Sequence, residues 1–229
     1  MPYSVEPMAV RDIPEVEAIE RQSFSSPWTR RAYEYDLVEN PLAHYIVVRC
    51  RSDGGTESGE PASQSSSPLP RTWRERLASM VTALAHALGV GASVEGVAAV
   101  PNEGPRPPVL GFAGLWMAVQ EAHLVTLAVD PAWRRRGLGE LLLVSAIDLA
   151  SALHATSVYL EVRVSNLAAK RLYEKYGFVV SRIRKGYYSD NGEDALEMVA
   201  DAIDGAQFQA RLQRLKKMLV EKLEERAEE

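Results

Sequence analysis

A loop rich in arginine and glycine is the part of this sequence best suited to bind a charged ligand. Leu127–Gly139 reads LAVDPAWRRRGLG, and the apolar periodicity that follows predicts a helix over Glu140–His154. Backbone N–H groups at a helix start lack partners within the helix and carry the positive end of its dipole, so they bind anions. Gly137 and Gly139 let a phosphate approach the backbone. Positive charge beside them comes from Arg134, Arg135 and Arg136. We therefore predict a pyrophosphate site.

A second segment places a carboxylate where it could accept a proton. The β-branched stretch Ser157–Val164 predicts a strand with Glu161 on the same face as Tyr159 and Arg163. Strands of a mixed α/β sheet are usually buried on both faces, so a glutamate in the middle of one needs a reason. Glu161 is either a general base that points into a cleft or one half of an ion pair, with Arg163 or another nearby arginine.

A phenol follows on the next predicted helix, which Asn166 caps and Gly177 closes after Tyr176. Tyr173 lies about two helical turns beyond Asn166, so the two residues should point to the same side. Tyr173 is either a core residue with a solvated hydroxyl or a general acid.

The elements that must position these groups follow from caps, turns and periodicity. Asp12 and Glu15 form a predicted capping box for one helix, and Thr29 caps a second helix that runs to Leu37. An amphipathic helix is expected over Asp204–Glu229. Strands are expected at Tyr3–Pro7, His44–Arg51, Val109–Val119, Ala122–Val129, Ser157–Val164, Phe178–Ile183 and Ala195–Ala200.

One long insertion interrupts this pattern. Ser52–Pro70 is rich in Ser, Gly, Pro and Glu and is expected to be a disordered linker. Arg71–Leu88 has apolar residues at helical spacing and predicts an amphipathic helix, which could pack over the core or contact a partner or a membrane surface. Val94–Val100 could form a short strand. We interpret Ser52–Pro108 as an insertion into one domain, residues 1–200, which residues 204–229 extend.

Composition narrows the class of protein. The chain has 229 residues, 46% of them hydrophobic, and a net charge of −5, which argues against a basic nucleic-acid-binding protein. A single cysteine, Cys50, cannot form an internal disulfide, and four scattered histidines lack metal-ligand spacing, so no metal is expected. We expect Cys50 to be a buried apolar residue. The start lacks the features of a signal peptide and no apolar run could span a bilayer, so we expect a cytoplasmic protein.

The loop points to a family when it is taken with the segments around it. Arg134-x-x-Gly137-x-Gly139 lacks the Gly-Lys-Ser/Thr of a nucleotide P-loop and the glycine spacing of a dinucleotide loop. It resembles the acetyl-CoA loop of the GCN5-related N-acetyltransferases, the GNAT superfamily. Five segments occur in order: SFSSPW (Ser23–Trp28), LAVDPAWRRRGLG (Leu127–Gly139), LEVRVSN (Leu160–Asn166), LYEKYGF (Leu172–Phe178) and RKGYYSDNGEDALEM (Arg184–Met198). Together they resemble the RimI-type branch, which acetylates the N-terminal α-amine of a small-subunit ribosomal protein.

The resemblance covers about Val5–Met198 apart from the insertion, and it implies a fold. That fold is α/β (α+β), with a central mixed, largely antiparallel twisted sheet of about seven strands flanked by helices. The resemblance also implies an acyltransferase that uses acetyl-CoA as co-substrate and takes the N-terminal peptide of a ribosomal protein, with alanine first, as acceptor. Nucleic acid is not an expected partner. The terminal helix could dock on its own domain or form a weak dimer.

The resemblance further implies roles for matching residues. Glu161 would be the general base, and Tyr173 would protonate the departing CoA thiolate. Backbone groups of Leu127, Ala128 and Val129 would meet the pantetheine arm and the acetyl carbonyl. The pyrophosphate and the rest of the cofactor would be held by Arg134, Arg135, Arg136, Gly137, Leu138, Gly139 and Asn166. The peptide cleft would be lined by Tyr187, Tyr188 and Glu193.

Two other functions are compatible with parts of the sequence. The same fold and cofactor could serve another acceptor, such as a broader set of protein N-termini, a lysine side chain or a small amine. A non-catalytic module that binds CoA or RNA could use the three arginines as a phosphate patch. Such a module would give Glu161 and Tyr173 no purpose, and the negative net charge also argues against it.

Overall fold

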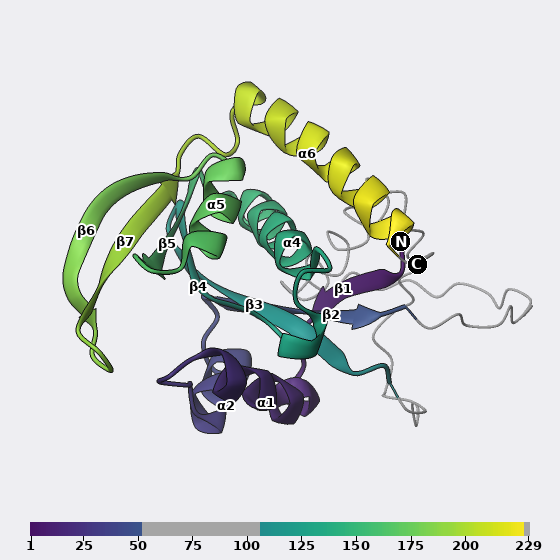
Figure 1. Ribbon diagram of the computed structural model, residues 1–229, viewed down its shortest axis with the longest axis vertical. Coiled ribbons are helices and arrows are strands. Elements are labelled where there is room, and N and C mark those ends of the chain that lie inside the picture. The colour runs from purple at the N-terminus through teal and green to yellow at the C-terminus, as the bar shows by residue number, and fades with distance from the viewer. Residues whose placement is uncertain (52–105, 227–229) are drawn as a thin grey trace, which may run out of the picture.

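A single seven-stranded sheet organises the computed structural model, which describes residues 1–51 and 106–226 (Figure 1). The linker, helix and strand predicted between residues 52 and 105 lie outside the described residues, as do the last residues of the predicted terminal helix. The division of the sequence into a domain and an insertion therefore stays a prediction.

The sheet is mixed and open, with the order β1-β2-β3-β4-β5-β7-β6. Every neighbouring pair is antiparallel except β4 and β5, which run parallel. This arrangement confirms the predicted class. The strands are β1 (Tyr3–Pro7), β2 (Ala43–Cys50), β3 (Val109–Ala118), β4 (Glu121–Val129), β5 (Ser157–Arg163), β6 (Val179–Tyr188) and β7 (Glu193–Ala200).

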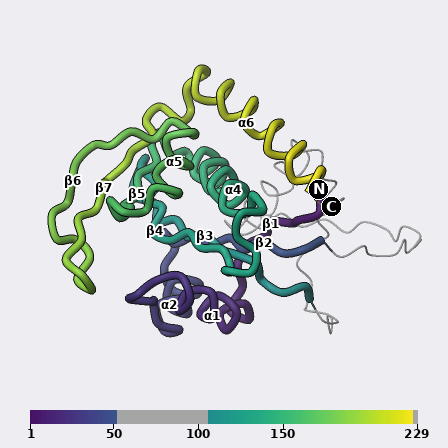
Figure 2. The backbone as a smooth tube through the Cα atoms, viewed as in Figure 1, coloured from purple at the N-terminus to yellow at the C-terminus, as the bar shows by residue number. Residues whose placement is uncertain are grey.

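Helices cover both faces of the sheet (Figures 1 and 2). On one face lie α1 (Ile13–Ser23) and α2 (Arg30–Val38), and on the other α4 (Leu138–Ala152), α5 (Leu167–Lys175) and α6 (Ala206–Glu225). Short 3-10 turns, Val10–Asp12 and Pro131–Trp133, precede α1 and follow β4. The larger core cluster lies between the sheet and α4, where Leu142, Leu143 and Ile147 are fully buried. None of the described helices is long and apolar enough to cross a membrane.

The parallel strands β4 and β5 pair over a short distance only. Their register joins Glu121 to Ser157, Ala122 to Val158 and His123 to Tyr159. Within the described part of the chain, no register pair joins the strands beyond His123. β4 continues beside β3 while β5 continues beside β7, so the backbone edge of β4 that would face β5 is left free of strand partners.

A β-bulge lies in β4 just beyond the point of separation. Gly114 pairs with Thr126 and Leu115 with Leu124, so Val125 has no partner on β3. A bulge of this kind changes which face the following side chains occupy. Ala122 and Leu124 pack in the α4 cluster before the bulge, and Val129 packs there after it.

Most predicted helix boundaries are confirmed, but the capping box at Asp12 is wrong. Thr29 and Asn166 accept hydrogen bonds from the N–H groups of Ala32 and Ala169, as expected of N-caps. Asp12 precedes α1 without capping it. Its carboxylate instead accepts from Ala9 N–H at 2.9 Å and from the buried guanidinium of Arg49 at 2.7 Å. A buried arginine needs a paired charge, and that requirement outweighs the local cap.

The predicted end of the Phe178–Ile183 strand is also wrong, because this strand, β6, continues to Tyr188. The extra residues include Lys185 and Gly186, which carry no strand signal. Pairing with β7 extends the strand, with irregular register between Arg184 and Tyr188. Tyr187 and Tyr188 therefore stand on a strand and not in a loop.

The C-terminal helix docks on its own domain. The leucine stripe of α6 is buried in the same cluster as α4: Leu212, Leu215, Leu219 and Leu223. The buried Lys216 also bonds Asp148 of α4. At the far end, a Cβ on Gly137 would lie 2.9 Å from Leu223 Cδ2, and Arg226 donates to the carbonyl of Arg135. α6 thus packs along α4 and touches the loop that begins it.

The two loop glycines offer a matched pair of substitutions. Gly137 has φ +93° and touches Leu223, whereas a Cβ on Gly139 would meet only Val129 and Leu127, at 3.7 and 4.0 Å. We expect Gly137→Ala to lower the free energy of unfolding by at least about 1–2 kcal/mol, from backbone strain alone. Gly139→Ala should be neutral or raise it by about 0.4–1 kcal/mol. Urea unfolding measures both, and equal losses would contradict this account of the loop.

Candidate active site

The start of α4 presents unpaired backbone donors, as predicted. Gly137 is the N-cap in a left-handed conformation, and the first bond of the helix runs from Leu141 N–H to its carbonyl. The N–H groups of Leu138, Gly139 and Glu140 come before that bond. Ordinary contacts surround the position of a Cβ on Gly139, so the fold itself does not require glycine there. A ligand that approaches the backbone would require it.

The three arginines of the loop play different structural parts. Arg134 donates from Nε to the Val129 carbonyl and from Nη2 to Ser23 Oγ, both at 3.0 Å, and so ties the loop to β4 and α1. Arg136 lies over the Trp133 ring at 4.7 Å. Arg135 has φ +66°. Arg134 thus shapes the loop, and the predicted contacts of all three with an anion stay predictions.

Glu161 lies beside the gap that opens where β4 and β5 separate beyond His123. Both of its carboxylate oxygens have a partner. Oε2 is 2.6 Å from Nε2 of His123, and Oε1 accepts from Arg184. The ion pair left open by the sequence therefore forms with Arg184 and not with Arg163. Burial alone would raise the pKa of the carboxyl, but the hydrogen bonds and charges of His123 and Arg184 outweigh it and lower the pKa. Glu161 is consequently ionised at neutral pH.

The sequence motifs do not single out His123. It is the last residue of β4 paired with β5, and its ring stacks on Tyr159 with centroids 4.3 Å apart and planes at 10°. Glu161 lies two residues beyond Tyr159 on the same face of β5. The signal in the sequence is the polar residue in the apolar strand AHLVTLAV. Its partner follows only from the register between two strands distant in sequence.

Tyr173 lies on α5 and Asn166 caps the start of that helix, but the two residues lie in different environments. Tyr173 is 8% exposed, with its ring 5.7 Å from that of Phe178. Burial, followed by the nearby Tyr188, raises the pKa of its phenol, which is therefore protonated at neutral pH. Asn166 is exposed and its side-chain oxygen caps the helix. Tyr173 can donate a proton, while contact of Asn166 with a cofactor stays a prediction.

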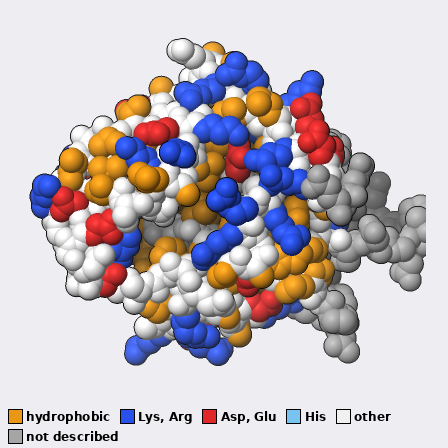
Figure 3. Space-filling view, viewed as in Figure 1, with side chains coloured by type: hydrophobic (Ala, Val, Ile, Leu, Met, Phe, Trp, Pro, Cys, Tyr) orange, Lys and Arg blue, Asp and Glu red, His pale blue; other side chains and the backbone are white. Residues whose placement is uncertain are grey.

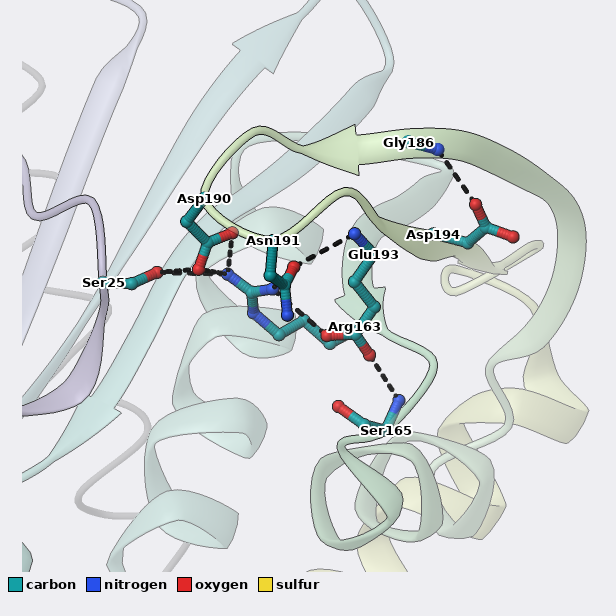
Figure 4. Close-up of polar contacts among 8 residues, drawn as sticks. All are labelled: Ser25, Arg163, Ser165, Gly186, Asp190, Asn191, Glu193 and Asp194. Carbon is teal, nitrogen blue, oxygen red and sulfur yellow. Dashed lines mark hydrogen bonds and ion pairs between the residues drawn. The ribbon is translucent and has the colours of Figure 1, made fainter.

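Arg163 is the hub of a polar network that joins two loops (Figure 4). Its guanidinium donates to Asp190 at 2.8 and 2.9 Å, to Asn191 and Glu193 at 3.1 Å, and to Ser25 at 3.2 Å. Ser25 also bonds Asp190 directly. The loop between α1 and α2 is thereby linked to the turn between β6 and β7.

The residues predicted to line a peptide cleft belong to the same region. Tyr187 and Tyr188 meet edge to face at 5.1 Å, and each lies against an arginine: Arg184 is 4.4 Å from the Tyr187 ring and Arg163 is 3.8 Å from the Tyr188 ring. Hydrogen bonds from Ser165, followed by Arg163, lower the pKa of Glu193 to about 2. Glu193 therefore holds the hub together. The space-filling view shows a hollow beside the β6–β7 hairpin, with lysine and arginine side chains along one side (Figure 3).

Comparison with known proteins identifies relatives of this arrangement. The pattern of the Acetyltransferase (GNAT) family matches residues 66–178. A Bacillus subtilis protein is 32% identical over 195 residues, which are 85% of this chain and 93% of that protein. Its name provisionally assigns it as a ribosomal protein bS18-alanine N-acetyltransferase.

Solved structures share the fold. The ribosomal-protein-S18-alanine N-acetyltransferase from Escherichia coli superimposes with a TM-score of 0.57 at 24% identity, over 87% of this chain and 94% of that one. Arabidopsis thaliana NAA60, solved with acetyl-CoA, gives 0.58 at 16% identity, over 89% and 99%. At these identities the likeness bears on the fold alone.

The Arg163 hub can be tested without knowledge of the ligand. Arg163→Met keeps the aliphatic stem and removes every hydrogen bond that the guanidinium donates to the hub. We expect the amides of residues 189–192 and of Ser165 to exchange hydrogen severalfold faster, because the turn loses its anchor. Arg182→Met is the control, since Arg182 lies on the same hairpin and pairs with Glu197 outside the hub. Unchanged exchange in Arg163→Met would show that the turn does not depend on the hub.

Proposed function

This chain belongs to the GNAT family of acetyltransferases, and from that premise we propose that it is an acetyl-CoA-dependent N-α-acetyltransferase. The proposed acceptor is the N-terminal amine, with alanine as first residue, of a small-subunit ribosomal protein. The observation that carries the proposal is the ionised Glu161 where β4 and β5 part, together with a buried and protonated Tyr173 on α5. The Bacillus subtilis and Escherichia coli relatives, whose names give that activity, support the acceptor.

The gap and the start of α4 suit acetyl-CoA, the substrate used by this family. Beyond His123 the free edge of β4 offers backbone groups of Leu127, Ala128 and Val129 to the pantetheine arm. The N–H groups at Leu138–Glu140 would hold the pyrophosphate, and the absence of a side chain at Gly139 leaves room for it. Arg135 and Arg136 would add charge beside it. Backbone N–H groups near the bulge would stabilise the negative oxygen that forms during transfer.

The chemistry needs one proton acceptor and one proton donor. An α-amine has a pKa of about 7.7–8.0, so loss of its proton near neutrality costs roughly 1 kcal/mol. The ionised Glu161 and its partners accept that proton, directly or through water. The neutral amine attacks the thioester within a ternary complex, and Tyr173 protonates the departing thiolate. No covalent enzyme intermediate is required.

The lowered pKa of Glu161 and the raised pKa of Tyr173 determine how kcat/KM should depend on pH. Because the pKa of Glu161 is lowered, the carboxylate stays ionised through the neutral range, and its titration does not change kcat/KM there. The acceptor amine reacts only when unprotonated, so kcat/KM should fall as pH drops below about 7.7–8.0. The raised pKa of Tyr173 keeps the acid protonated at the alkaline end.

The central test is steady-state acetylation of a peptide that carries the ribosomal protein's N-terminus. Glu161→Gln and Tyr173→Phe should each lower kcat by on the order of 10²–10⁴-fold. An α-blocked copy and a peptide whose only amine is an internal lysine are the controls. Turnover confined to the lysine peptide would reassign the acceptor, and acetyl-CoA binding with no turnover would refute the proposed substrate.

Gly139→Ala separates the cofactor loop from the fold. The added Cβ would keep the pyrophosphate from N–H groups whose bonds to a charged ligand are worth about 1.5–3 kcal/mol each. Acetyl-CoA should therefore bind about tenfold or more weakly, with no loss of stability. Isothermal titration calorimetry gives the affinity, and undiminished binding would place the pyrophosphate elsewhere.

A further inference from the structure

We propose that His123 accepts the proton of the attacking amine and that Glu161 acts through it by holding the imidazole. This inference rests on the proposed function and names a residue that the family motifs leave out. Its basis is the arrangement of three side chains from separate strands: His123 on β4, Glu161 on β5 and Arg184 on β6.

Glu161 is poorly placed to meet a substrate itself. Its side chain is 7% exposed, and both oxygens already hold a partner. To bind an ammonium directly it would have to give up His123 or Arg184. His123 has a side chain 21% exposed and only one nitrogen committed to Glu161. The imidazole is thus the more accessible end of the pair.

The hydrogen bond to Glu161 fixes which nitrogen is free. An ionised carboxylate only accepts, so His123 Nε2 must carry the proton in the 2.6 Å contact. The lone pair of the neutral ring then lies on Nδ1. This is the logic of a carboxylate that orients a histidine base and stabilises the imidazolium when it forms. The stack on Tyr159 sets the plane of the ring.

The location of His123 suits the reaction. It is the last residue of β4 paired with β5, so it stands where the two strands part. Charged groups near it stand on four strands. Glu161 bonds it from β5, Arg184 lies behind Glu161 on β6, and Glu121 stands two residues before it on β4. From β7, Glu197 reaches the neighbouring Tyr159 electrostatically. Trp116 of β3 is its partner across the sheet.

The proton balance is complete. One proton passes from the ammonium to Nδ1 and then to water. The amine nitrogen forms the C–N bond, and its second proton passes to water as the C–S bond breaks. The thiolate takes a proton from Tyr173, whose phenolate recovers it from the medium. The acceptor nitrogen thus loses two protons, the sulfur gains one, and one is released to solvent.

Kinetics of matched histidine variants test the proposal. His123→Asn should lower kcat by on the order of 10²–10⁴-fold and leave the Kd of acetyl-CoA unchanged. Plots of kcat against pH should differ between the wild type and His123→Asn, because the bound ammonium of the variant must lose its proton to water instead of to Nδ1. Added imidazole should restore turnover to His123→Ala. The control is His154→Asn, because His154 is exposed at the end of α4 and asparagine tolerates its φ of +66°.

A spectroscopic measurement on the wild type guards against a folding defect in the variants. Nitrogen-15 spectra of the ring should show His123 protonated on Nε2 and unprotonated on Nδ1 at high pH, and Glu161→Gln should weaken that preference. The opposite tautomer, or turnover of His123→Asn within threefold of the wild type while Glu161→Gln is inactive, would overturn the proposal and leave Glu161 as the base. Failure of the wild type to acetylate any α-amine would instead refute the proposed function.

Discussion

The separation of two parallel strands is the constraint on which the rest of this structure depends. β4 and β5 pair at three register positions and then follow different neighbours, β3 and β7. Backbone groups at a sheet interior are normally paired, so the free edge of β4 must be satisfied by water or by a ligand. A chain such as pantetheine, which carries amides, can supply the missing partners. The bulge at Val125 adds to this effect by breaking the pairing on the β3 side as well.

Different contacts hold the two walls of the gap. On the cofactor side, α4 is fixed by the sheet below it and by α6 along it, and Leu223 and Arg226 reach the loop around Gly137. On the acceptor side, charged networks take the place of packing. Arg163 joins the α1–α2 loop to the β6–β7 turn, and Arg184 joins β6 to Glu161. Apolar packing thus supports the part where we propose that the cofactor binds, and polar contacts hold the part where a peptide would enter.

Local features of the site could be predicted from the sequence, whereas the pairings between distant strands could not. The helix after the arginine loop, the Asn166 cap and the alternation of Glu161 with buried neighbours depend on a few adjacent residues, and the structure agrees with each. The predicted capping box at Asp12 is wrong because the buried Arg49 of β2 donates a hydrogen bond to the Asp12 carboxylate. The contacts of Glu161 with His123 and Arg184 depend on register between strands far apart in the sequence. No local spacing encodes that register, which is why His123 went unrecognised.

We propose that the cofactor binds in this gap. The most direct test is to record NMR spectra of the backbone amides of the full chain during titration with CoA. The account predicts that the largest shifts fall on two separate stretches, the β4 edge over residues 124–129 and the start of α4 over residues 138–140. Both should saturate with one dissociation constant, because one ligand would span them. Shifts confined to another surface, or at the arginine loop without any on β4, would contradict the account.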